Sequence, residues 1–211
     1  PRLRLIGAYL RQGDNDKAVD ICRQALTCFP EKSELWIVLG ELNHRQGNIE
    51  AAIDAFSKAI ELKPDDLTGY SALVELQEST NDLVAAIDIY ERLIAKSPNS
   101  AALYYQLGIN LAQINDTLYA QRMFQKVLAM EPRITRARFF LALTYFETEE
   151  YARCAEELRL YLLDRPYDTA ALEYRAAALA HIGKLDEARY AMELILAGKD
   201  AQNKHSLQHA W

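Results

Sequence analysis

Apolar residues recur along this chain with the spacing of amphipathic helices, two helices at a time. One such pair contains Leu35, Trp36, Leu39 and Leu42, followed by Ala51, Ala52, Ala55, Phe56 and Ala59. Residues three and four apart share one face of a helix, so each stretch predicts a helix with one buried stripe. Gly47 lies between the two stretches and tolerates a positive φ. The pattern therefore predicts two helices joined by a tight turn.

Five prolines follow these helix pairs at a constant spacing of 34 residues. They are Pro30, Pro64, Pro98, Pro132 and Pro166. Proline lacks the donor for another helical turn and disfavours helix in the residue before it, so each one ends a pair. A fixed period of this length predicts a repeat array in which each copy contacts its neighbours.

The period divides the chain into six copies that form one predicted array over residues 1–198. The copies cover about 1–32, 33–66, 67–100, 101–134, 135–168 and 169–198, and residues 199–211 form a tail or the start of a further helix. The turn position of Gly47 recurs as Gly13, Asn81, Asn115, Glu149 and Gly183. Glycine and asparagine suit positive φ, so Glu149 is the one departure.

Further positions recur and carry a family resemblance. The second copy contains Trp36, Leu39, Gly40, Ala52, Phe56 and Pro64 in the spacing of a tetratricopeptide repeat (TPR), with Asn43 in place of the tyrosine. The small site of Ala52 recurs as Ala18, Ala86, Ala120, Cys154 and Ala188. The chain resembles the TPR family over residues 1–198. The resemblance implies an all-α fold, a right-handed α-solenoid of helix-turn-helix repeats.

The small residues at these positions are explained by helix packing. Gly40 and Ala52 are small where two helices approach closely, and Trp36 or Phe56 fills the space beside the crossing. The match weakens toward the C-terminus, where Arg138, Tyr161 and Arg175 replace residues that the family prefers. We therefore expect different packing in the fifth and sixth copies.

Charge and composition limit the classes of partner and the surroundings that we expect for this protein. The formal net charge is −6, with the acidic excess in the first half, which argues against nucleic acid because its phosphates require a clustered basic surface. No apolar run is long enough to cross a bilayer, so direct membrane insertion is not expected. Three cysteines without metal-ligand spacing favour reduced packing residues and a cytoplasmic compartment, with the periplasm as the alternative.

The first helix of each copy supplies the concave surface that the resemblance implies. In the fourth to sixth copies its exposed positions are apolar and aromatic. We predict partner-binding residues there at Tyr105, Ile109, Phe139, Leu143, Phe146 and Tyr174. Large rigid rings dominate interface energetics, so this stripe predicts a docking site for a peptide or helix. Two alternatives remain: the rings pack between neighbouring copies, or the stripe is buried by a continuation of the chain or a second copy.

The earlier copies present a different surface. Their predicted partner-binding residues are Glu41, Arg45, Glu75 and Glu78. TPR proteins that hold acidic chaperone tails use a clamp of lysine, asparagine and arginine, and the matching positions here do not provide one. Glutamates would repel a carboxylate, so a basic segment followed by apolar residues fits the two stretches better.

Few residues have the spacing of a metal, phosphate-binding or catalytic site. His205 and His209 are four apart, as metal-binding histidines on one helix are, but they have no third ligand nearby. Gly183 and Lys184 lack the rest of a phosphate-binding loop, and no nucleophile has the spacing of a catalytic group. We predict no enzyme activity, no metal site and no cofactor.

Three functions are compatible with this pattern. The first is a non-catalytic scaffold that binds a peptide or helix of a partner protein in its groove. The second is a recognition or targeting arm of a larger enzyme or of a secretion or export machine. The third is a self-assembly module, because an array without polar capping helices exposes apolar ends that can associate.

Overall fold

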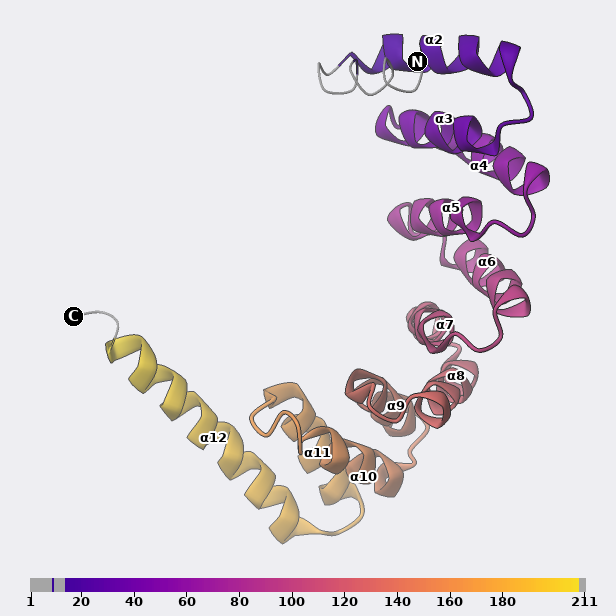
Figure 1. Ribbon diagram of the computed structural model, residues 1–211. Helices are drawn as coiled ribbons and strands as arrows, with labels where there is room; N and C mark the ends of the chain where they lie inside the picture. The colour runs from indigo at the N-terminus through magenta and orange to yellow at the C-terminus, as the bar shows by residue number, and fades with distance from the viewer. Residues whose placement is uncertain (1–8, 10–13, 209–211) are drawn as a thin grey trace. The chain divides into compact units, whose positions relative to one another are not determined.

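The computed structural model describes residue 9 and residues 14–208, with side chains as far as residue 196. These residues form eleven helices and no strand (Figure 1). The helices are α2 (Asn15–Cys28), α3 (Ser33–Arg45), α4 (Ile49–Leu62), α5 (Leu67–Ser79), α6 (Leu83–Lys96), α7 (Ala101–Gln113), α8 (Thr117–Met130), α9 (Thr135–Glu147), α10 (Tyr151–Tyr161), α11 (Thr169–His181) and α12 (Leu185–Gln208). The all-α helical repeat fold is confirmed.

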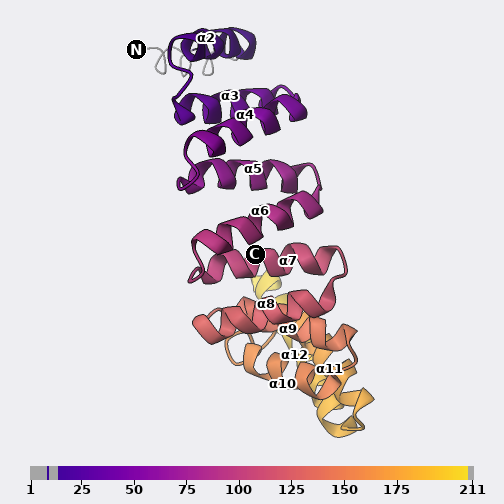
Figure 2. The same cartoon turned by 90° about the vertical axis from the view of Figure 1, so that its right-hand side faces the viewer.

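The predicted copies from residue 33 on fold as helical hairpins, of which the first helix is called helix A and the second helix B. Helices α3, α5, α7, α9 and α11 are A helices, and the even-numbered helices are B helices. Each described A helix packs on the B helix of its own copy, and within each half one hairpin follows another (Figure 2). The predicted hairpin pattern is therefore present throughout the described chain.

The chain forms two compact parts, Pro1–Pro98 and Asn99–Trp211, called here the N-terminal half and the C-terminal half. In the N-terminal half, α3 contacts α2, α4 and α5. In the C-terminal half, α9 contacts α7, α8, α10 and α11. Contacts within each half thus connect successive copies, while a single array over residues 1–198 stays a prediction.

Two glycines show why the repeat requires small residues. A Cβ atom on Gly108 would lie 2.8 Å from Cε1 of Phe124, and one on Gly40 would have ring atoms of Phe56 within 3.0 Å. Both rings belong to helix B of the same hairpin and are buried. The expected close approach is therefore that of an aromatic ring on the backbone of helix A.

The hairpin turns share one backbone conformation. Gly47, Asn81, Asn115, Glu149 and Gly183 all have φ between 60° and 78°. Glu149 adopts this left-handed conformation with φ of 60°, although its side chain disfavours it. Gly13, the remaining predicted turn residue, lies outside the described residues. The repeat geometry therefore overrides the preference of the residue.

The residues that depart from the family pattern in the last copies form polar pairs. Arg138 donates to Glu157 at 2.8 Å, and Tyr161 donates to Asp168 at 2.7 Å. Arg175 lies 3.7 Å from Glu187. These contacts connect helices or neighbouring turns, so the altered residues keep the same architecture.

Two of the three cysteines lie in the core. Cys22 and Cys154 are fully buried, while Cys28 is exposed. Burial raises the pKa of Cys22 to about 11 and that of Cys154 to about 12, because the thiolate would lose its hydration. Cys22 and Cys154 are therefore packing residues, as the repeat pattern predicts. Among the described helices, none is long and apolar enough to cross a membrane.

Candidate partner-binding surfaces

A hollow of about 280 Å³ lies in the N-terminal half and is called the acidic hollow. Its lining consists of Glu41, His44, Arg45, Phe56, Ala72 and Glu75. Glu41 and Glu75 are 34 residues apart and occupy the same position of consecutive A helices, α3 and α5. Phe56 is buried and supplies an apolar wall. Three of the four acidic-stretch residues predicted from the sequence therefore line one hollow.

The charged groups of the acidic hollow are available to a ligand. Within the described part of the chain, no ion pair or hydrogen bond involves the side chains of Glu41, Arg45 or Glu75. His44 Nε2 lies 3.3 Å from Ser79 Oγ, which holds the imidazole at the edge of the hollow. Two carboxylates and one guanidinium beside an apolar wall favour a ligand that carries positive charge on an apolar stem.

Glu78 has a different place. Its Oε1 accepts a hydrogen bond of 3.0 Å from the Tyr90 hydroxyl on α6, and it does not line the acidic hollow. Burial, with the Glu78 charge beside it, raises the pKa of Tyr90 well above its ordinary value. Glu78 thus has a contact within the fold, between α5 and α6, that the sequence pattern did not indicate.

In the C-terminal half, five aromatic side chains form the first ring cluster. It consists of Tyr105, Phe124, Phe139, Phe140 and Tyr161. Phe140 stacks on Phe124 with a centroid distance of 5.6 Å, and Tyr105 meets both rings edge to face at about 6 Å. Burial raises the pKa of Tyr105, partly offset by the charge of Arg136. Phe124 is fully buried, while Tyr105, Phe139 and Phe140 are half-buried.

Four further rings form the second ring cluster: Phe146, Tyr151, Tyr174 and His181. Phe146 is at its centre and meets Tyr151 and Tyr174 edge to face, both at 5.3 Å. Tyr151 stacks on His181 with a centroid distance of 4.1 Å and an interplanar angle of 7°. Tyr174 is 39% exposed and His181 is exposed, so this cluster reaches the solvent.

The predicted aromatic stripe is therefore divided between packing and surface. Tyr105 and Phe139 join the first cluster, Phe146 and Tyr174 join the second, and Ile109 and Leu143 are half-buried on α7 and α9. Phe140 and Tyr145 pack between helices, as one alternative expects. Sequence reasoning missed Tyr151 and His181. The seven-residue spacing of Tyr174 and His181 on α11 was the available signal, since it places them on one helix face.

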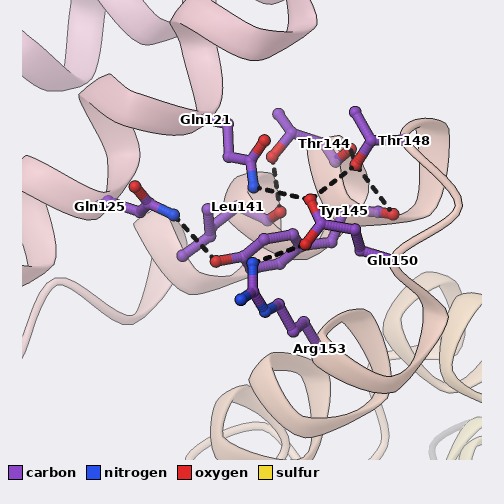
Figure 3. A network of polar contacts seen from close by, with 8 residues as sticks. All are labelled: Gln121, Gln125, Leu141, Thr144, Tyr145, Thr148, Glu150 and Arg153. Carbon is purple, nitrogen blue, oxygen red and sulfur yellow. Dashed lines mark hydrogen bonds and ion pairs between the residues drawn. The ribbon is translucent and has the colours of Figure 1, made fainter.

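A polar network around Tyr145 connects the end of α9 with α8 and with the start of α10 (Figure 3). Gln125 of α8 donates to the Tyr145 hydroxyl at 2.9 Å. Glu150, before α10, accepts from Gln121 at 3.2 Å and from Arg153 at 2.6 Å. Thr148 donates to the backbone oxygen of Thr144 at 3.0 Å. Hydrogen bonds thus connect α8 to α9, the helix that contributes Phe139, Leu143 and Phe146, and to Glu150 at the start of α10.

Among the described residues, no three His, Cys, Asp or Glu side chains are arranged to hold a metal ion. The side chains of His205 and His209 lie outside the described residues. Gly183 is a hairpin-turn residue with φ of 78°, as the repeat pattern predicts.

Helical hairpins at a 34-residue period, with small residues beneath aromatic rings and left-handed turns, define a TPR protein. Comparison with family models agrees with this class. The chain belongs to the family described as the cytochrome c-type biogenesis protein H TPR domain, which matches residues 21–138. TPR proteins generally are protein-interaction scaffolds, and this scaffold family is typically non-catalytic. No curated protein matches the sequence.

Solved structures show the same fold at low sequence identity. A crystal structure of MamA has a TM-score of 0.73 at 20% identity and covers 82% of this chain and 94% of its own. YrrB, described as a TPR protein with an unusual peptide-binding site, has a TM-score of 0.67 at 20% identity, over 90% of this chain and 96% of its own. PilF of Pseudomonas aeruginosa has a TM-score of 0.58 at 20% identity, over 79% and 76%.

Proposed function

We propose that this protein binds a segment of a partner protein on the A-helix face of its C-terminal half. The binding residues are Tyr105, Ile109, Phe139, Leu143, Phe146 and Tyr174. The observation that carries the proposal is the pair of ring clusters on α7, α9 and α11, whose rings are held in fixed positions yet remain partly exposed. Preorganised aromatic side chains lose little entropy on binding, which favours them as anchors.

The anchor on the partner is an apolar side chain or the apolar stripe of a helix. Ile109 and Leu143 are half-buried on helices that contact the same ring clusters, so the surface offers both rings and aliphatic groups. A helix that inserts residues at i, i+3 and i+4 can contact such a surface. The polar network around Tyr145 supports this role, because it keeps α9 in position without partner contact.

In this proposal, the acidic hollow of the N-terminal half binds a basic residue of the ligand. Glu41 and Glu75 attract a lysine or arginine side chain, and Phe56 contacts its aliphatic stem. Arg45 on the same wall pairs with a carboxylate or backbone carbonyl of the bound segment. The proposed ligand therefore contains a basic residue as well as an apolar anchor.

The family points to the process in which the partner acts. Since the matching family is named for cytochrome c-type biogenesis protein H, we propose that the partner is a protein of c-type cytochrome biogenesis. Affinity capture with this chain, followed by titration of the recombinant captured protein, tests both the process and the surface.

The binding experiment compares a triple variant of the proposed surface with a double variant outside it. Tyr105→Ala combined with Phe139→Asp and Leu143→Asp is expected to weaken partner binding at least tenfold, because it removes a ring and places charges among apolar groups. Leu163→Asp with Tyr167→Asp alters exposed apolar residues outside α7, α9 and α11 and is the control. Circular dichroism verifies that both fold. Equal affinity of the two variants contradicts the proposed surface.

A charge reversal tests the acidic hollow. Glu75→Lys is expected to weaken partner binding severalfold at low salt and to reduce the dependence of affinity on ionic strength. Asp54→Lys, which changes an exposed acid on α4 outside the hollow, has the same effect on net charge and serves as the control. An identical response of both variants would show that only net charge matters.

A further inference from the structure

The acidic hollow of the N-terminal half has a counterpart in the C-terminal half that is filled by an aromatic ring. Phe56 and Phe124 occupy one repeat position, two repeat lengths apart, and Ala72 and Phe140 occupy another. Phe56 and Ala72 both line the hollow. In the C-terminal half, the ring of Phe140 stacks on Phe124 with a centroid distance of 5.6 Å and an interplanar angle of 18°. The hollow therefore lies at the repeat position that a stacked ring occupies in the other half.

Phe56 and Phe124 have the same orientation within their hairpins. A Cβ atom on Gly40 would meet Cε1, Cδ1 and Cζ of Phe56, and one on Gly108 would meet the same three atoms of Phe124. The same ring edge thus faces helix A in both hairpins. The face of Phe124 that Phe140 covers consequently corresponds to the face of Phe56 that borders the hollow.

Ala72 is the residue that leaves this space open. The other described A helices carry larger side chains at its repeat position, namely Val38, Gln106, Phe140 and Tyr174. The hollow of about 280 Å³ is slightly smaller than most small-ligand pockets, which measure roughly 300–1,000 Å³. It therefore has room for one side chain of a bound segment.

The lining of the hollow differs in charge from its counterpart. Glu41 and Glu75 are exposed and line the hollow, whereas Ile109 and Leu143 hold the same repeat positions in the C-terminal half. Together with Arg45, the two glutamates give the lining a surplus of one negative charge. A single cationic side chain balances this surplus, while a neutral ring makes no use of the carboxylates.

His44 does not compete with a ligand for these carboxylates. The Ser79 hydroxyl donates its only proton to the Leu76 carbonyl oxygen at 2.7 Å. Its oxygen therefore accepts the 3.3 Å contact from His44 Nε2. The N–H group of neutral His44 is thus used within the fold, which leaves Glu41 and Glu75 to the ligand.

We propose that the acidic hollow is specific for an arginine side chain of the partner, and that Ala72 determines this specificity. The specificity rests on the basic-residue preference proposed above for the same hollow. The planar guanidinium stacks on Phe56, and its N–H groups donate to Glu41 and Glu75. Arginine combines stacking with several hydrogen bonds to carboxylates, whereas the lysine ammonium is compact, strongly hydrated and unable to stack.

The probes are the N-acetyl amides of arginine, lysine and phenylalanine, each of which presents one side chain without backbone charges. Each is titrated at low salt into the whole chain labelled with ¹⁵N, and the backbone amide signals of α3 and α5 report binding. We expect a saturable change with the arginine amide. We expect the lysine and phenylalanine amides to bind at least fivefold more weakly.

Matched variants locate the bound side chain. Ala72→Phe places in the hollow the residue that the fifth copy has at this position, so it should fold and lose at least tenfold in arginine-amide affinity. Ala95→Phe adds the same ring at an exposed position of α6 outside the hollow and should bind within about twofold of the wild type. Glu75→Gln keeps the side-chain size and should weaken arginine binding severalfold, whereas Asp54→Asn should not. Circular dichroism verifies the fold of all four.

Four results would overturn arginine specificity, and they separate it from the preference on which it rests. Equal affinities of the arginine and lysine amides would leave a basic-residue preference without selection for arginine. Tighter binding of the phenylalanine amide would assign the hollow to a neutral ring. Unchanged arginine binding by Ala72→Phe would place the ligand outside the hollow. Absence of a saturable change with both basic amides would contradict the basic-residue preference as well.

Discussion

At the scale of single residues, the repeat imposes conformations and sizes that residue preference alone does not predict. Glu149 adopts φ of 60° at a turn where the other described copies use glycine or asparagine. Its left-handed backbone costs roughly 1–2 kcal/mol for a residue with a Cβ atom. The hairpin therefore forms despite Glu149, and the contacts of α9 and α10 offset the cost.

Replacing Glu149 with glycine should stabilise the protein. Glycine removes the steric cost of the positive φ but gains entropy in the unfolded chain, so we expect the free energy of unfolding to rise by about 0.5–1 kcal/mol. Gly183→Ala should lower it by a similar amount, because Gly183 has φ of 78° and open space around its Cα. Urea denaturation measures both. A loss of stability in Glu149→Gly would show that the side chain contributes more than the backbone costs.

At the scale of elements, the sequence predicted the helices and turns well because each copy repeats one local pattern. The prolines, the small sites and the turn residues all have local causes that the spacing displays. The ring clusters were only partly predictable, since Tyr151 and His181 meet Phe146 through tertiary packing of α10 and α11 on α9. The contact of Glu78 with Tyr90 was likewise missed because both residues fit the surface and core patterns separately.

A buried alanine on α6 tests the helix packing at this scale. Ala86 on α6 is 0% exposed, so Ala86→Leu should overpack its site and cost about 1–3 kcal/mol of stability. Thermal unfolding measures the loss. Ala95→Leu, an exposed position on the same helix, is the matched control and should leave the melting temperature nearly unchanged. Equal melting temperatures for both variants would contradict the packing described for α6.

At the scale of the whole molecule, the described helices of each half contact helices one or two places away in sequence, so stability is distributed along each half. The sequence predicts one array, and the structure describes two compact halves within it. The spacing of motifs specifies local hairpins and does not indicate where the two compact halves divide.

Because stability is distributed, a destabilising substitution in the middle of a half should lower hydrogen-exchange protection in more helices than one in its last helix. Leu141 on α9 is 2% exposed and Ile195 on α12 is 6% exposed. Leu141→Ala should reduce hydrogen-exchange protection in α8, α9 and α10, while Ile195→Ala should reduce it mainly in α11 and α12. Mass spectrometry of exchanged peptides measures both patterns. Uniform loss over all helices in either variant would indicate a single cooperative unit.

The reactivity of the two buried cysteines also reports local unfolding of the native protein. Cys22 belongs to the N-terminal half and Cys154 to the C-terminal half, and burial raises the pKa of each to about 11 and about 12. At neutral pH a thiol reagent modifies such groups only when their helices separate, while the exposed Cys28 reacts at once. Labelling rates therefore time the opening of each half without any engineered probe.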